Sequence, residues 1–227
     1  SFIHHKEEKF IMKLKKIASL ALAGIMAVSM LAGCKDGSSS SSSSSENTTP
    51  ATGVSAEFAS YLKDNKNVTF ADDAEYQGYL SKILKNLDPK HDELDAVKTI
   101  DDKNNDFVPE VIDVLKNNVN GYVSNQAISY LNKTTTVSTK TDAVIASAYV
   151  APGSMSQSVV LKAVADTLNG SICDAAFHDF SVDDTDDSIR YDYKYNGNVS
   201  IQKVTDGSSS AWYVLVVVEI DTTKVDA

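Results

Sequence analysis

A run of eight serines, Ser38–Ser45, separates two parts of the chain that differ in their capacity to fold. The polar stretch from Lys35 to Gly53 that contains this run has too few apolar side chains to form a core, so we expect it to stay disordered. A flexible chain of this length spans roughly 24 Å. The packed core must therefore come from residues 54–227, which are enough for one domain.

The segment before the serines has the layout of a secretory signal. Basic residues within 12–16 precede an uncharged stretch from Ile17 to Ala32, and the small residue Gly33 precedes Cys34. The uncharged stretch is shorter than the roughly 20 residues with which a helix crosses a bilayer. Its end, Leu31-Ala32-Gly33-Cys34, resembles the lipobox of bacterial lipoproteins.

This resemblance implies that residues 1–33 are removed and that Cys34 receives a diacylglyceryl group and becomes the N-terminus. Two acyl chains, palmitate for example, are enough for stable anchoring in a membrane. We therefore expect a membrane-anchored protein on the extracytoplasmic side of the cell membrane, with residues 34–53 as its tether. The abundance of Asn, Lys, Asp and Ser favours a Gram-positive cell surface.

The residues before Met12 are unlike the start of a signal segment. Lys6-Glu7-Glu8 can be encoded by a purine-rich tract of the kind that lies upstream of bacterial start codons. Our hypothesis is that Met12 initiates translation and that residues 1–11 are a translated leader. The alternative is a genuine extension of the basic region.

Net charge and cysteine content limit the partners and the covalent structure. Removal of residues 1–33 takes away five basic and two acidic residues and changes the formal charge from −10 to −13. An acidic surface repels phosphate backbones, so nucleic acid is not an expected partner. After lipidation of Cys34, Cys173 is the last thiol, and an intrachain disulfide is excluded.

The first half of the domain has helical periodicity. We expect a short helix near 55–64, a second helix whose apolar stripe runs from Tyr76 to Leu87, a third near 107–117 and a weaker one around 127–131. Asp72 or Asp73 can cap the second of these. A threonine-rich link at 134–141 marks a seam between a helical subregion, 54–133, and a sheet-bearing subregion, 142–227.

The second half changes period. A β-branched run at 143–150 predicts a strand, and a helical stripe follows over 159–168, entered at Ser154 or Ser156 and closed by Asn169-Gly170. Residues 189–195 alternate between apolar and charged side chains. The apolar run from Trp212 to Val218 predicts a central strand, which we expect to carry helices on one side of the sheet.

The Asn196-Gly197 dipeptide predicts a hairpin. A three-residue loop over 196–198 keeps Tyr195 opposite Val199 and so preserves one apolar face, whereas a two-residue loop does not. With a further turn at Asp206-Gly207, the chain reads as N-terminal helices, then a strand, a helix and a three-stranded antiparallel meander. The fold class is α+β, with helices packed on the sheet.

Two acidic clusters are candidates for a metal. Residues 102–113 resemble an EF-hand loop, because oxygen-bearing side chains occupy positions 1, 3, 5, 9 and 12: Asp102, Asn104, Asp106, Glu110 and Asp113. Phe107 stands where that loop needs glycine, and an acidic helix N-terminus explains the same residues. Calcium is thus one hypothesis for this segment. A second group, Asp183, Asp184, Asp186 and Asp187, could hold a cation or form a solvated turn.

Aromatic residues provide the candidate ligand platform. Tyr191, Tyr193 and Tyr195 share one face of the strand at 189–195, and Trp212 is expected in the same sheet. Aromatic faces bind sugar rings and peptide side chains, although they also form ordinary cores.

No catalytic constellation stands out in the sequence, so we assign no catalytic residue. The leading hypothesis is a module that binds a protein, a peptide or a glycan at the cell envelope. The alternative is a small envelope hydrolase that acts on cell-wall or glycan polymer through acidic residues. An assembly or stalk component is a third reading.

Overall fold

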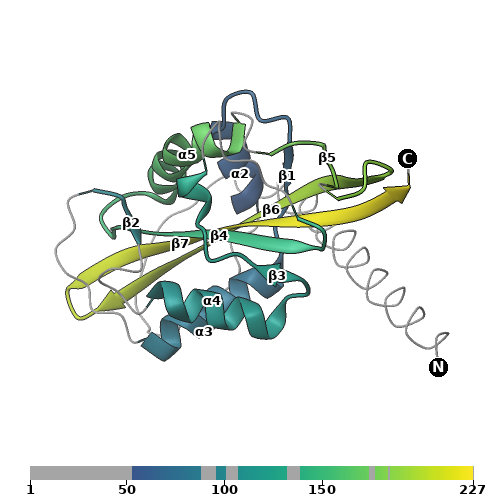
Figure 1. Ribbon diagram of the computed structural model, residues 1–227. Helices are drawn as coiled ribbons and strands as arrows, with labels where there is room; N and C mark the ends of the chain where they lie inside the picture. The colour runs from purple at the N-terminus through teal and green to yellow at the C-terminus, as the bar shows by residue number, and fades with distance from the viewer. Residues whose placement is uncertain are drawn as a thin grey trace.

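The computed structural model describes residues 53–87, 96–100, 107–131, 139–173, 177–183 and 185–226. Within them, seven strands form one mixed sheet (Figure 1): five follow the order β1-β6-β7-β4-β2, while β3 pairs with β4 and β5 pairs with β6. Four α-helices pack on this sheet. The α+β fold class is confirmed. The predicted signal segment, Cys34 and the serine run lie outside the described residues.

Two long strands form the spine of the sheet. β6 (Ile189–Asp206) and β7 (Ser209–Asp226) pair antiparallel over their full length and turn at Gly207, which has a positive φ of 57°. β7 also pairs with β4 (Ala143–Pro152). The prediction that the run 212–218 is a central strand is therefore confirmed, and its side chains from Tyr213 to Val218 are buried on both faces.

The hairpin predicted at residues 196–198 is wrong. β6 passes straight through Gly197, which pairs with Val218 on one side and with Phe70 of β1 (Val68–Phe70) on the other. The odd-numbered residues Tyr195, Val199 and Ile201 stay on one face without any loop, since a strand alternates with period two. The three-stranded meander is consequently a two-stranded hairpin.

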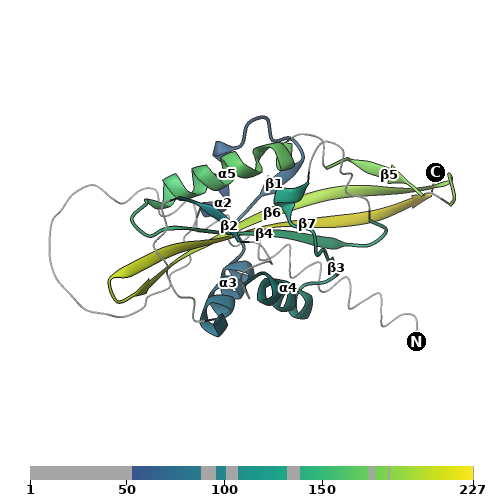
Figure 2. The same ribbon diagram turned by 60° about the vertical axis from the view of Figure 1, so that its left-hand side comes forward.

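Helices cover both faces of the sheet, not one as expected (Figure 2). α2 (Val54–Tyr61) and α5 (Gln157–Cys173) share a core with the odd-numbered side of β6, including Tyr195. α3 (Ala74–Leu87) and α4 (Phe107–Asn118) share a second core with the opposite side of β7. A central strand with no polar side requires this double cover.

The chain passes from one face to the other around the edge of β6. Asp72 follows β1 and accepts hydrogen bonds from the backbone N–H groups of Gly53 and Ser55, which caps α2. Asp73 accepts one from the backbone of Glu75 at the start of α3, at 2.8 Å. The sequence left open which of the two aspartates caps α3. Asp73 caps it, and Asp72 caps α2.

Side chains, not a strand, complete the edge of β6 beyond β1. The Val199 N–H donates to Ser55 Oγ at 2.9 Å, and the Ile201 N–H donates to Gln77 Oε1 at 3.3 Å. Ser55 is fully buried. Buried backbone groups need such partners, so α2 and α3 are held at this edge by direct hydrogen bonds.

The remaining strands are short and lie at the edges. β2 (Lys98–Ile100) and β3 (Tyr122–Val123) pair with β4, and β5 (Phe180–Val182) pairs with β6. Because β1, β2 and β3 all join the one sheet, the predicted helical subregion also supplies strands. The weak helix near 127–131 is a single 3-10 turn, η1 (Ile128–Tyr130).

The predicted end of α5 at Asn169-Gly170 is also wrong. The helix continues to Cys173 because Ile172 is fully buried and Ser171 Oγ donates to the Leu131 carbonyl at 2.7 Å. Its predicted start is confirmed, since Ser156 Oγ accepts a hydrogen bond from the Val159 N–H. Val159 itself, expected on the apolar stripe, is 51% exposed.

Candidate functional site

The EF-hand-like segment is only partly described. Asp102, Asn104 and Asp106 lie outside the described residues. Glu110 and Asp113 are on α4, where Glu110 accepts from Asn86 Nδ2 at 2.7 Å and Asp113 from Asn117 Nδ2 at 3.3 Å. The helix begins at Phe107, where an EF-hand loop would make its glycine turn. Calcium binding by this segment stays a prediction.

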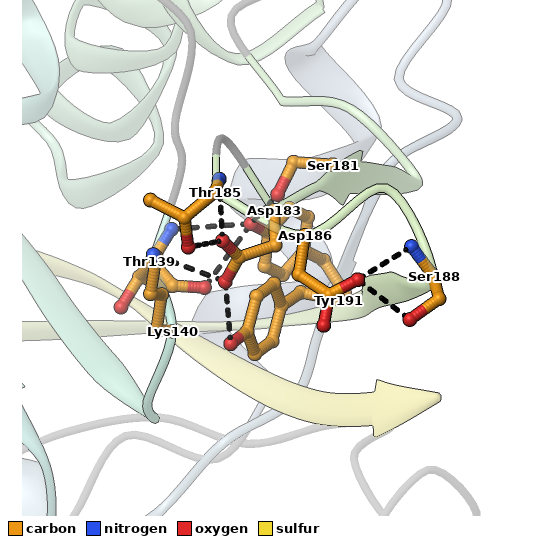
Figure 3. A network of polar contacts seen from close by, with 9 residues as sticks. Thr139, Lys140, Ser181, Asp183, Thr185, Asp186, Ser188 and Tyr191 are labelled. Atoms are coloured by element: carbon orange, nitrogen blue, oxygen red, sulfur yellow. Dashed lines mark hydrogen bonds and ion pairs between the residues drawn. The ribbon is translucent and has the colours of Figure 1, made fainter. Parts of the chain in front are cut away.

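The second acidic cluster contains a buried carboxylate, Asp183 (Figure 3). Its Oδ1 accepts from the backbone N–H of Thr185 at 2.9 Å and from the Thr185 hydroxyl at 2.6 Å. Its Oδ2 accepts from the Tyr191 hydroxyl at 3.1 Å and pairs with Lys140 Nζ at 3.0 Å. These four donors match the acceptor capacity of one carboxylate.

Hydrogen bonding sets the charge state of this cluster. The two hydrogen bonds from Thr185, followed by the one from Lys140, hold the pKa of Asp183 well below its usual range. Hydrogen bonds from the side chain and backbone of Ser188 likewise lower the pKa of Asp186. Both groups are therefore carboxylates, and protein donors already engage each of them.

The cluster does not form a metal site among the described residues. Asp184 lies outside them, and Asp187 is exposed in the turn before β6. No group of three or more His, Cys, Asp or Glu side chains suited to a metal occurs in the described part of the chain. Asp183 instead links the segment at Lys140 to β6 through Tyr191.

The three tyrosines are buried rather than displayed. Tyr191, Tyr193 and Tyr195 are at most 8% exposed and belong to the core under α5 and α2. The Tyr193 hydroxyl contacts Ser181 Oγ and the backbone of Thr139, and the Tyr195 hydroxyl donates to the His178 carbonyl at 2.6 Å. Burial raises the pKa of Tyr195, which stays a neutral donor.

Trp212 lies far from these tyrosines. It pairs with Lys203, whereas Tyr195 pairs with Ile220, eight residues further along β7. At the rise of a strand this separation is roughly 26 Å. The Trp212 indole donates to the Met155 carbonyl at 2.9 Å and its ring lies 5.5 Å from Lys203 Nζ. The structure therefore does not bring the predicted platform together.

A pocket that the sequence did not indicate lies at the opposite edge of the sheet, along β4. Four segments line it: the end of β2, one side of α4, the stretch from the end of β3 through η1, and the middle of β4. The lining residues are Ile100, Val108, Val111, Ile112, Ser124, Asn125, Gln126, Ala127, Tyr130, Ala146, Ser147 and Ala148. Tyr130 on its rim is 59% exposed.

The pocket is electrically neutral. None of its lining residues is charged, although 23% of the chain is charged and the net charge is −10. Aliphatic side chains of α4, with Ala146 and Ala148, supply apolar surface, and amide and hydroxyl groups stand beside it. An apolar concavity with a few polar groups is typical of a ligand site.

A buried serine positions one wall of the pocket. Ser147 Oγ accepts a hydrogen bond from the Ser129 N–H at 3.1 Å, which ties η1 and its exposed Tyr130 to β4. The fully buried Tyr149 is next along the same side of β4, and burial raises the pKa of its hydroxyl. The side of β4 that carries Ser147 and Tyr149 therefore presents uncharged hydroxyl groups to the interior.

Sequence reasoning had little chance of finding this pocket. Its lining comes from four separate segments and contains no motif. The small residues Ala146 and Ala148, alternating on one side of a strand, are the one local signal. No match to this chain was found among protein-family models, curated proteins or solved structures. No helix in the described residues is both long and apolar enough to span a membrane.

Proposed function

We propose that the protein is a lipid-anchored, extracytoplasmic binding module. The lipobox-like Leu31-Ala32-Gly33-Cys34 and the serine-rich tether support the location. Diacylglyceryl on Cys34 holds the chain in the membrane, and residues 34–53 let the folded part reach a protein, peptide or glycan of a Gram-positive envelope.

The observation that carries the binding function is the neutral pocket along β4. It combines aliphatic surface, an exposed Tyr130 ring, and the amides of Asn125 and Gln126. The aliphatic surface offers apolar contact to a ligand, and the Tyr130 ring and the two amides can fix its orientation. An uncharged pocket on an acidic protein selects for an uncharged group.

The charge states at the acidic cluster favour binding over hydrolysis. A carboxylic acid that protonates a leaving group needs a raised pKa. The pKa values of Asp183 and Asp186 are shifted downward, and their oxygens are engaged by hydrogen bonds. A hydrolase would have to use carboxylates elsewhere in the chain.

A screen against the full chain tests the proposal. The probes are uncharged, end-capped peptides and neutral oligosaccharides such as chitotriose. We expect at least one probe to bind and to lose at least tenfold in affinity in Ala146→Leu, which fills the pocket, and in Tyr130→Ala, which removes an exposed ring. Val159→Ala on α5 is the matched control, because Val159 is similarly exposed and is not a lining residue. Binding that survives both pocket variants, or no binding at all, contradicts the proposal.

A further inference from the structure

The chain contains three Asn-Gly dipeptides, and the fold places each in a different backbone setting. Asn169-Gly170 lies inside α5, and Asn196-Gly197 lies inside β6. Asn120-Gly121 lies in the link between Asn118, where α4 ends, and Tyr122, where β3 begins. An asparagine followed by glycine is chemically labile, because no side chain shields the glycine N–H and its nitrogen can approach the asparagine amide.

Regular secondary structure restrains two of the three dipeptides. Cyclisation requires the peptide plane between the two residues to rotate until the glycine nitrogen faces the asparagine Cγ. In α5 that N–H is held by the carbonyl four residues earlier, and Asn169 Oδ1 also accepts from the Lys63 N–H at 2.7 Å. In β6, Gly197 is buried between β1 and β7 and lies against the Phe70 ring. Neither peptide plane is free to rotate.

Asn120-Gly121 lacks these restraints in the part of the chain that the structure describes. Both residues are exposed, and Gly121 has a positive φ of 97°. The Val119 N–H before them still donates to the Leu115 carbonyl of α4, and the Tyr122 N–H after them donates to the Asp142 carbonyl. Between these two bonds, neither the Asn120 side chain nor the Gly121 N–H bonds to another described residue.

We propose that Asn120 is a site of spontaneous deamidation, which does not depend on the proposed binding function. The Gly121 nitrogen attacks Asn120 Cγ and closes a succinimide ring. The Cγ–Nδ2 bond breaks, and Nδ2 leaves as ammonia with the proton from the Gly121 N–H. Water then adds to one of the two ring carbonyl carbons. Opening at Cγ gives aspartate and opening at the main-chain carbonyl gives isoaspartate, so water is the co-reactant and nothing is oxidised or reduced.

The isoaspartate product should loosen β3. It lengthens the main chain by one methylene immediately before Gly121, which has no room for even a Cβ beside the Asp142 carbonyl. β3 has two residues and is held by hydrogen bonds from the N–H groups of Tyr122 and Ser124, each 2.8 Å long. The segment that follows β3 lines the pocket, so the change reaches one of the pocket walls.

The test incubates the folded full chain in mildly alkaline buffer, digests samples at acidic pH and measures the mass of the peptides that contain each Asn-Gly dipeptide. We expect Asn120 to gain the mass difference between O and NH at least tenfold faster than Asn169 or Asn196, with both aspartate and isoaspartate formed. In concentrated urea the three rates should converge, because the fold no longer restrains the other two. Asn120→Gln is the control variant, because its longer side chain would have to close a larger ring that forms more slowly.

A rate at Asn120 no higher than the rates at Asn169 and Asn196 in the folded chain overturns the proposal, and so does a difference between the dipeptides that persists in urea. Amide hydrogen exchange tests the structural consequence, with Asn120→Asp as the matched control because it adds the charge without the methylene. Exchange at Tyr122 and Ser124 should be at least fivefold faster in the purified isoaspartate form than in Asn120→Asp. Equal exchange in the two forms would contradict the loosening of β3.

Discussion

Gly197 lies directly against the ring of Phe70, where β1 pairs with β6. A Cβ on residue 197 would be well inside contact distance of three ring atoms of Phe70. The ring also packs at 5.1 Å, centroid to centroid, on Phe58 of α2. Glycine at this position allows the chain between α2 and α3 to cross the edge of the sheet.

Gly197→Ala should therefore destabilise the protein by about 1–3 kcal/mol, because the added methyl overpacks a ring that has little room to move. Urea unfolding of the full chain measures the effect. Gly78→Ala in α3 is the control, since nothing lies within 4 Å of the position of an added Cβ. Alanine is the better helix former, so this substitution should raise the free energy of unfolding by about 0.5–1 kcal/mol. Partial rescue of Gly197→Ala by Phe70→Leu would identify the clash, and equal effects of the two glycine variants would exclude it.

The hydrogen bond from the Val199 N–H to Ser55 Oγ should be one of the more costly to remove. Ser55→Ala leaves a buried donor without its partner, so we expect a loss of about 1–3 kcal/mol in unfolding free energy. Ser60→Ala, an exposed position on the same helix, should change stability by less than about 0.5 kcal/mol. Amide hydrogen exchange at Val199 should also accelerate in Ser55→Ala alone. Unchanged exchange there would mean that the edge of β6 is protected in another way.

Asp183 should make the protein sensitive to acid. Its pKa is lowered in the folded state, so its contribution to stability is present above the unfolded carboxyl pKa of about 3.9 and is lost as pH falls through the folded value. Asp183→Asn should lower the urea midpoint at neutral pH and flatten its decline below about pH 4. Asp166→Asn, the control, breaks an exposed ion pair with Lys162 and should leave the decline of the urea midpoint below about pH 4 unchanged. If the urea midpoint of Asp183→Asn declines in acid as steeply as that of the parent chain, the lowered pKa of Asp183 is contradicted.

Tyr79 gives the corresponding prediction at alkaline pH. Partial burial, followed by the charge of Glu75 and the hydrogen bond to it, raises the pKa of Tyr79 to about 12. The unfolded value is about 10, so its stabilising contribution is complete below that pH and is lost as pH rises through about 12. Tyrosinate absorbance of Glu75→Gln, compared with that of the parent chain, should show one tyrosine titrating earlier. If no tyrosine changes its titration, the contact with Glu75 is absent in solution.

The parts of the fold that were predictable from sequence depend on local periodicity. The stripe of Tyr76, Leu80 and Ile83 gives α3 because a single helix buries all three. The unbroken apolar run within β7 similarly indicates a strand covered on both faces. Asn196-Gly197 led to the wrong prediction of a hairpin, because glycine is equally suited to a tight turn and to a strand position where another side chain packs against the backbone. Only the position of Phe70, distant in sequence, decides between them.

The candidate sites were less predictable because they depend on contacts between distant segments. The tyrosines of β6 form a real aromatic face, but Asp183, Thr139 and His178 reach them from other segments and engage their hydroxyls. The pocket along β4 is lined by segments that are distant from one another in the sequence. Neither arrangement leaves a local pattern in the sequence, because each depends on which distant segments come together in the fold.

The most direct test of the account is the intact mass of the protein recovered from membranes of its native host. We predict a chain that begins at Cys34 and carries the added mass of a diacylglyceryl group, and we expect Cys34→Ser to lose both the processing and the membrane association. A protein recovered from the cytosol with residues 1–33 attached and no acyl mass would contradict the anchored binding module.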